Sequence, residues 1–220
     1  MSSATTADLH HDAADDPVAP PLLARPALQA SLAATLIPAT FALIAASHWA
    51  GVAWYDNPKE FFEENRPATW ASVATLWLTA FLCFAAARGD PRRRARQFWV
   101  ASGIAFFIAG ADDGFRIHEG LDKLFTWLFD LPRNKGGGLD DWIVLAWAVP
   151  VLVTAWRARR ELWAMPRVLG PWAVAAGLFA AMVWADMQNA APWLEEGLKA
   201  VAGATFAVGA AGGSGPASDA

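Results

Sequence analysis

Residues 111–119 carry three carboxylates and a histidine and are the stretch of the chain best suited to chemistry. They read Ala-Asp-Asp-Gly-Phe-Arg-Ile-His-Glu, so Asp112 and Asp113 are adjacent, and His118 and Glu119 follow closely. The aspartates stand at the end of an apolar run. If that run crosses a membrane, a charge near its centre costs roughly 2.5–3.5 kcal/mol, which makes ionisable residues there candidates for a functional site.

A second acidic pair, Glu195 and Glu196, opens the last apolar run and precedes Lys199. Carboxylates stabilise the first turn of a helix, and Glu195 can pair with Lys199 four residues later, so capping is an alternative to a functional role. Other polar residues near the ends of apolar runs are His48, Asp140, Asp141 and Asp186.

Composition places the chain among membrane proteins. Its 220 residues are 55% hydrophobic and only 17% charged, with 13 tryptophans and a net charge of −4. Several apolar runs are long enough to cross a bilayer. The single cysteine, Cys83, lies inside one of them, which excludes an intrachain disulfide and a cysteine-rich metal site.

The predicted fold is an all-α, polytopic membrane bundle of six transmembrane helices, residues 27–211, between unstructured tails at residues 1–26 and 212–220. The expected spans are approximately residues 28–54, 68–87, 97–113, 142–156, 169–185 and 193–210. An amphipathic helix should follow residue 117, because Ile117, Leu121, Leu124 and Leu128 recur at helical spacing. It would lie on the outer membrane surface or pack as a lid on the bundle.

Arginines set the expected orientation in the cell membrane. Nine of the 17 basic residues fall in the second and fourth connections, around Arg88–Arg96 and Arg157–Arg167. Short connections rich in arginine stay in the cytoplasm, so both termini should be cytoplasmic. Tryptophans such as Trp156 and Trp99 are expected in interfacial belts. This topology explains the arginines, so nucleic acid is not an expected partner, whereas membrane lipids are.

Helical geometry limits what residues 111–119 can do by themselves. Counted from Gln97 at about 1.5 Å per residue, Asp112 is about 22 Å into a core about 30 Å thick. On a continuous helix, Asp112, Arg116, Glu119 and Lys123 form a ladder of alternating charge on one face, and Asp113 and His118 face elsewhere. A break at Gly110 or Gly114 would allow a different arrangement, as in broken helices that line a cavity.

The topology brings the acidic residues and His118 to the outer side of the bundle, where three functions are possible. One is a metal-assisted hydrolase of lipids that holds Zn, Mn or Fe. The others are a cation or proton transport component and a structural or accessory protein. The predicted catalytic residues are Asp112, Asp113, Glu195 and Glu196, and the predicted metal ligands are Asp113, His118, Glu119 and Glu196.

The Asp-Asp-x-Phe-x-x-His-Glu run, followed late in the chain by Glu-Glu-x-x-Lys, resembles a pattern in uncharacterised bacterial multi-pass membrane proteins. That resemblance covers about residues 55–200 and implies no particular activity. Asp and His at one membrane face are also similar to the alkaline-ceramidase-like superfamily of zinc-dependent membrane hydrolases. The chain differs from that superfamily in having six expected spans rather than seven and no His-x-x-x-His on a late helix.

Overall fold

The computed structural model describes residues 26–57, 62, 66–129, 139–188 and 191–214, but not the side chains of residues 119, 139–145, 186–187 and 214. Over this part the fold is entirely helical. The elements are α1 (Pro26–Tyr55), α2 (Pro67–Gly89), α3 (Arg93–Phe115), α4 (Ile117–Phe129), α5 (Leu139–Arg157), α6 (Arg159–Trp163), α7 (Pro166–Met187), α8 (Pro192–Ala211) and the 3-10 turn η2 (Gly212–Ser214).

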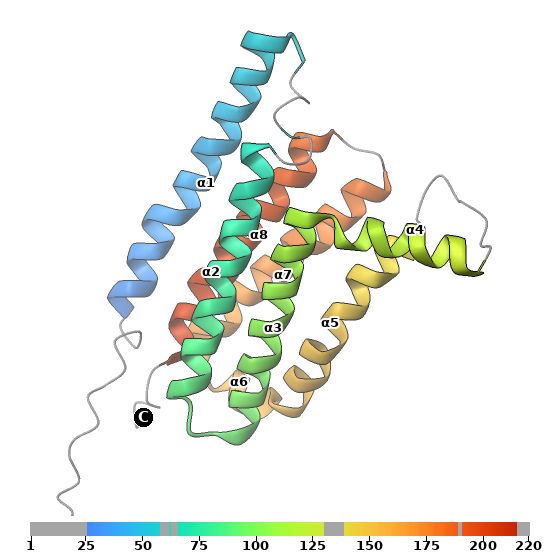
Figure 1. The fold of residues 1–220 in the computed structure, drawn as a ribbon. Coiled ribbons are helices and arrows are strands. Elements are labelled where there is room, and N and C mark those ends of the chain that lie inside the picture. The colour runs from blue at the N-terminus through green and yellow to red at the C-terminus, as the bar shows by residue number, and fades with distance from the viewer. Residues whose placement is uncertain (1–25, 58–61, 63–65, 130–138, 189–190, 215–220) are drawn as a thin grey trace, which may run out of the picture.

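Each of the six expected spans corresponds to one long helix, namely α1, α2, α3, α5, α7 or α8. Four of these, α1, α2, α3 and α7, are long and apolar enough to cross a membrane by length and composition. Helix α8 is not among the four and carries Glu195, Glu196 and Lys199 in its first turns. The long helices run up and down along one bundle, and prolines such as Pro67 and Pro192 stand in the first turn, where the absent N–H is tolerated (Figure 1).

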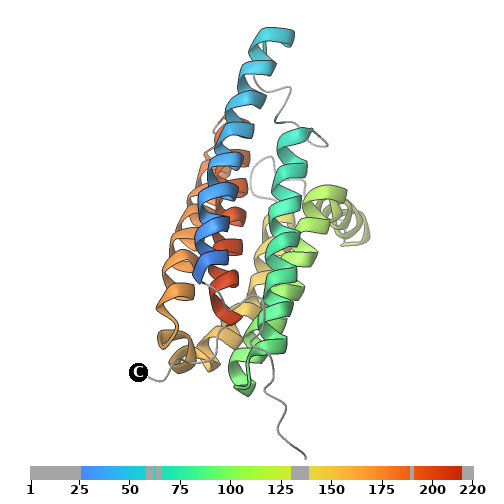
Figure 2. The same cartoon turned by 90° about the vertical axis from the view of Figure 1, so that its left-hand side faces the viewer.

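Small side chains let the helices approach closely around α8, which packs against α1, α2 and α7 (Figure 2). Ala80 and Cys83 on α2 and Ala204 on α8 are fully buried. At the contact between α2 and α8, the Thr79 hydroxyl donates to the carbonyl of Gly203 over 3.1 Å. Close approach through small residues, with a hydroxyl bond between helices, is typical of membrane bundles.

Aromatic residues fill the core toward the end of the bundle that holds the arginines. Trp99 has no exposed surface and lies against Phe98 and Trp172, with ring centroids 5.0 Å and 5.6 Å away. The prediction that Trp99 belongs to an interfacial belt is therefore wrong, because the side chain faces α7 and not the outside. Trp156, in contrast, is 70% exposed.

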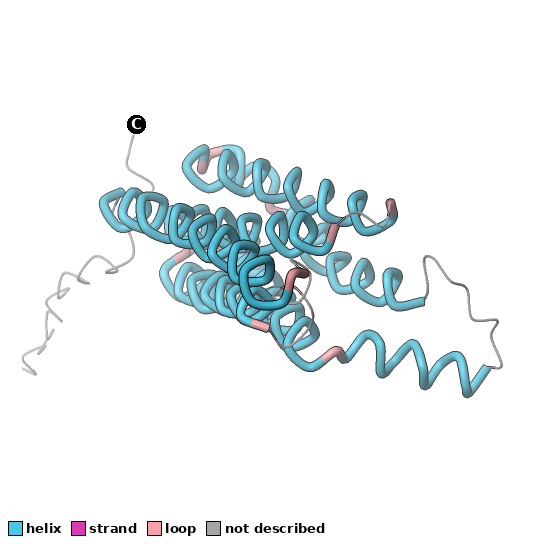
Figure 3. The backbone as a smooth tube through the Cα atoms, turned by 90° about the horizontal axis from the view of Figure 1, so that it is seen from above, coloured by secondary structure: helices cyan, strands magenta, loops and turns pink. Residues whose placement is uncertain are grey.

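Helix α4 runs across the direction of the long helices and extends away from the bundle (Figures 1 and 3). It contacts the start of α5 and the end of α3, and it leaves Leu124 and Trp127 largely exposed on its apolar side. This arrangement favours the surface-lying helix over the lid.

Both predicted tails fall mostly outside the described residues. Residues 1–25 and 215–220 are not described, so the expectation for them is untested. Residues 212–214, which the sequence places in the C-terminal tail, instead form η2. A side chain at Gly213 would meet the Trp99 ring, and one at Gly212 would meet Gln29 of α1, so η2 packs against the bundle.

Candidate functional site

A sharp turn between α3 and α4 positions the aspartate pair. Helix α3 ends at Phe115, and Arg116 adopts a left-handed conformation with φ of 55°. The backbone N–H of Arg116 donates to the carbonyl of Asp112 over 2.7 Å, which closes the end of α3. Left-handed residues commonly end helices, although glycine usually takes the position. The predicted break in the helix therefore exists, at Arg116 rather than at Gly110 or Gly114.

Asp112 holds the start of α4 in place. One of its carboxylate oxygens, Oδ1, accepts the backbone N–H of His118 over 2.6 Å, and Oδ2 lies 2.7 Å from Nδ1 of the His118 ring. The Asp112 residue is only 4% exposed. A carboxylate that accepts a backbone N–H in the first turn of a helix acts as its cap, and here the cap comes from the preceding helix.

The first rung of the charge ladder expected on a continuous helix, from Asp112 to Arg116, is replaced by a contact with His118, whereas the rungs through Glu119 lie outside the described side chains. Both carboxylate oxygens of Asp112 contact His118, because the left-handed turn at Arg116 changes the direction of the chain. The prediction that His118 lies on a different face from Asp112 is wrong for the same reason.

Asp113 points away from Asp112 and meets α8. Its Oδ1 accepts a hydrogen bond from Lys199 Nζ over 2.8 Å. Lys199 Nζ donates a second hydrogen bond, also 2.8 Å long, to Oε1 of Glu196. We call Asp113, Glu196 and Lys199 the carboxylate–lysine cluster. It links the last turns of α3 to the first turns of α8, at the end of the bundle from which α4 departs (Figure 1).

The carboxylate–lysine cluster is withdrawn from the surface. Its side chains are 15% exposed for Asp113, 11% for Glu196 and 14% for Lys199. The second oxygens of the two carboxylates, Oδ2 of Asp113 and Oε2 of Glu196, are buried and accept no hydrogen bond from the described residues. Buried polar atoms are normally satisfied, so these two acceptors need an explanation.

The two carboxylates are brought together as the sequence suggests. Because each has an oxygen 2.8 Å from the same Nζ atom, those oxygens are at most twice that distance apart. The spacing in the sequence pairs Lys199 with Glu195, but Lys199 contacts Glu196, three residues away, and Asp113. The sequence did not predict the position of Lys199 between two helices, although a lysine about two turns into an apolar span is itself an unusual signal.

The other sequence candidates are not members of the cluster or lie outside the described side chains. Glu195 is half-buried. His48 is exposed and packs edge-on against Trp193, with centroids 5.9 Å apart. The predicted ligand Glu119 lies outside the described side chains, and so do Asp140, Asp141 and Asp186.

Among the described residues there is no group of three or more His, Cys, Asp or Glu side chains that could hold a metal ion. The cation that lies between the carboxylates of Asp113 and Glu196 is the ammonium of Lys199. The predicted ligands therefore do not form one set: His118 contacts Asp112, Asp113 and Glu196 contact Lys199, and Glu119 lies outside the described side chains.

Comparison with known proteins places the chain in one family. Residues 27–211 match the family described as "Domain of unknown function (DUF8692)", and the protein belongs to it. The match covers every long helix of the bundle. No curated protein and no solved structure matched the chain.

Proposed function

We propose that the protein is a six-span protein of the cell membrane in which the carboxylate–lysine cluster binds a proton, as a component of proton or cation transport. The observation that carries this proposal is a single, largely buried ammonium shared by two largely buried carboxylates, each with one unpartnered oxygen among the described residues. Ionisable residues within membrane helices commonly mark proton relays and ion pathways.

Charge balance supports a bound cation. With both carboxylates ionised and Lys199 protonated, the cluster carries a net charge of −1 at a buried position. A buried charge without a partner is strongly unfavourable, and two carboxylates at one site do not both ionise readily. One proton bound by the cluster removes the net charge, and the two unpartnered oxygens are the atoms able to accept it.

The position of the cluster fits a site that is reached from one side. Asp113 and Glu196 both lie near the end of the bundle from which α4 departs, which is the outer end in the proposed topology. In that topology the arginine-rich connections and both termini are cytoplasmic. The cluster is then an entry or sensing site and not a complete path.

The metal-assisted hydrolase and the purely structural role stay predictions of the sequence. A divalent ion at Asp113 and Glu196 would have to displace the Lys199 ammonium from both carboxylates. A structural role explains why Lys199 links α3 to α8, but it does not explain why two buried carboxylate oxygens accept no hydrogen bond from the described residues.

Thermal stability of the purified protein in detergent, across a range of pH, tests the proposal. A cation that binds only the folded state stabilises it by mass action. We therefore expect the stability of the wild type, relative to Glu196→Gln, to rise as the proton concentration rises, and to be unchanged when sodium replaces choline at constant pH. Asp122→Asn, which removes a carboxylate on α4, is the control and should follow the wild type.

Two results would overturn the proposal. If sodium and not pH shifts the difference between the wild type and Glu196→Gln, the cluster binds sodium. If neither does, it is a fixed tie between helices.

A further inference from the structure

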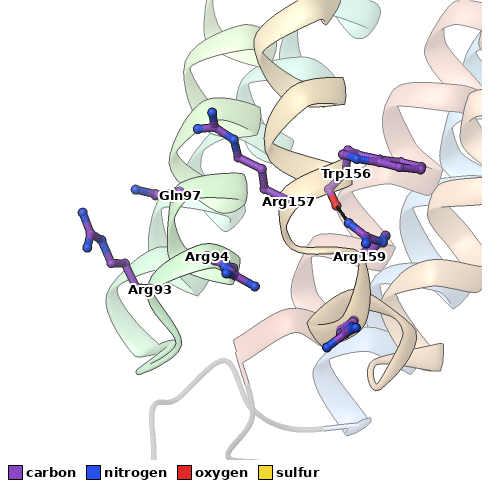
Figure 4. A pocket seen from close by; sticks show the side chains of 7 residues that line it. Arg93, Arg94, Gln97, Trp156, Arg157 and Arg159 are labelled. Carbon is purple, nitrogen blue, oxygen red and sulfur yellow. Dashed lines mark hydrogen bonds between the residues drawn. The ribbon is translucent and has the colours of Figure 1, made fainter.

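The arginine-rich end of the bundle contains an open pocket with a volume of about 680 Å³. It lies at the end of α3 and α5 remote from the carboxylate–lysine cluster (Figures 1 and 4). We call it the arginine pocket. Its lining residues come from α3, α5 and α6 and are Arg93, Arg94, Gln97, Trp156, Arg157, Arg159 and Arg160.

The arginine pocket carries five positive charges, and none of its lining residues, all of them described, is acidic. Glu161 of α6 does not line the pocket, and the carboxylate of Asp90 is already occupied, because Arg92 donates to both of its oxygens over 2.9 Å and 2.8 Å. That hydrogen bond raises the pKa of Arg92 above its ordinary value. The pocket therefore keeps an excess of guanidinium groups that are suited to an anion.

One feature adds to the positive potential of the pocket, and a second one holds one of its arginines in place. Arg93 and Arg94 stand in the first turn of α3, where the helix dipole is itself positive. Arg159 donates to the carbonyl of Trp156 over 3.0 Å, and its guanidinium lies 4.7 Å from the centre of the Trp156 ring (Figure 4). Guanidinium groups bind phosphate through planar, paired hydrogen bonds.

An exposed apolar stripe leads from the arginine pocket along α5. Trp156 lines the pocket, and Leu152 and Val149 precede it on the same face of the helix at spacings of four and three. They are 70%, 65% and 54% exposed, respectively. A soluble phosphate would leave this apolar stripe exposed to water, whereas the acyl chains of a lipid would bury it.

We propose that the arginine pocket binds the phosphate of an anionic phospholipid, with the acyl chains along the α5 stripe. This inference rests on the membrane location of the proposed function, but it is independent of proton binding at the other end of the bundle. Basic pockets between helices at the cytoplasmic surface are suited to acidic lipid head groups.

The test reconstitutes the full chain in nanodiscs of phosphatidylcholine, with and without phosphatidylglycerol, and measures lipid retention and thermal stability. We expect Arg94→Gln with Arg157→Gln to weaken retention of phosphatidylglycerol by about tenfold or more, since each arginine near the surface contributes on the order of a factor of five. The control, Arg88→Gln with Arg96→Gln, removes the same charge from a separate pocket at the same end and should retain the lipid.

A single variant and two comparisons complete the experiment. If the double variant does not fold, Arg157→Gln alone should weaken retention by about fivefold. Equal losses in the Arg94/Arg157 and Arg88/Arg96 variants would show diffuse surface charge and overturn the proposal. Inorganic phosphate that stabilises the detergent-purified protein as well as phosphatidylglycerol does would show a soluble phosphate ligand, and equal retention of both lipids would show no site; either result would also overturn it.

Discussion

At the scale of residues, two adjacent aspartates perform separate tasks. Asp112 caps α4 through His118, and Asp113 meets Lys199 on α8, because neighbouring helical side chains project about 100° apart. The sequence shows that this pair is unusual, but it does not show the partners. Asp112 finds His118 only because Arg116 is left-handed, and nothing in the residue type of an arginine predicts a positive φ.

A double-mutant cycle tests the division between the aspartates. Asp112→Asn and His118→Gln, measured singly and together by chemical unfolding in detergent, should deviate from additivity by about 0.5–3 kcal/mol, as residues in direct contact do. Asp112→Asn combined with Arg116→Gln should be close to additive. Strong coupling in the second cycle and none in the first would show that the continuous-helix ladder is formed after all.

At the scale of elements, α8 connects α2 with α7. Its face of small residues packs on α2 and α7, and its first turns carry Glu196 and Lys199 to Asp113. Removing the close contact between α2 and α8 should therefore affect both the fold and the site.

Gly203→Val tests this contact. A side chain at Gly203 would meet the Thr75 side chain, with its Cβ at 3.1 Å, so overpacking should destabilise the protein by about 1–3 kcal/mol. The matched control is Gly177→Ala on α7, where nothing lies within 4 Å and where alanine should be neutral or stabilising by up to about 1 kcal/mol. Equal effects in the two variants, measured by thermal unfolding, would contradict the close packing of α2 and α8.

Helix positions are largely predictable from the sequence, because apolar runs and prolines mark their limits. The amphipathic helix is predictable too, as α4, since its spacing repeats at three and four. Contacts between helices are not. The burial of Trp99 and the pairing of Lys199 with Asp113 depend on which faces meet, and helices that are apolar all round carry no polar face in their sequence to mark the opposite, buried side.

At the scale of the whole molecule, the ionisable residues separate into two ends. The carboxylate–lysine cluster lies at one end of the bundle and the arginine pocket at the other. In the proposed orientation the arginines face the cytoplasm and the cluster faces outward.

Reporter fusions test this orientation. A reporter inserted near Gly137, in the connection after α4, should be active on the outer side, and one fused at Ala220 should be active in the cytoplasm. The opposite labelling would place the cluster on the cytoplasmic side, and the same side for both would rule out an odd number of crossings between them.

Infrared spectroscopy of the membrane-embedded protein can detect a proton bound at the carboxylate–lysine cluster, because protonated and ionised carboxyl groups absorb at different frequencies. We expect a protonated carboxyl band at neutral pH that is lost in both Asp113→Asn and Glu196→Gln, since the two groups share one site, and that persists in Asp122→Asn. A wild-type spectrum without a protonated carboxyl band at neutral pH would contradict proton binding at the carboxylate–lysine cluster. A band that stays unchanged in each of the two single variants would contradict it as well.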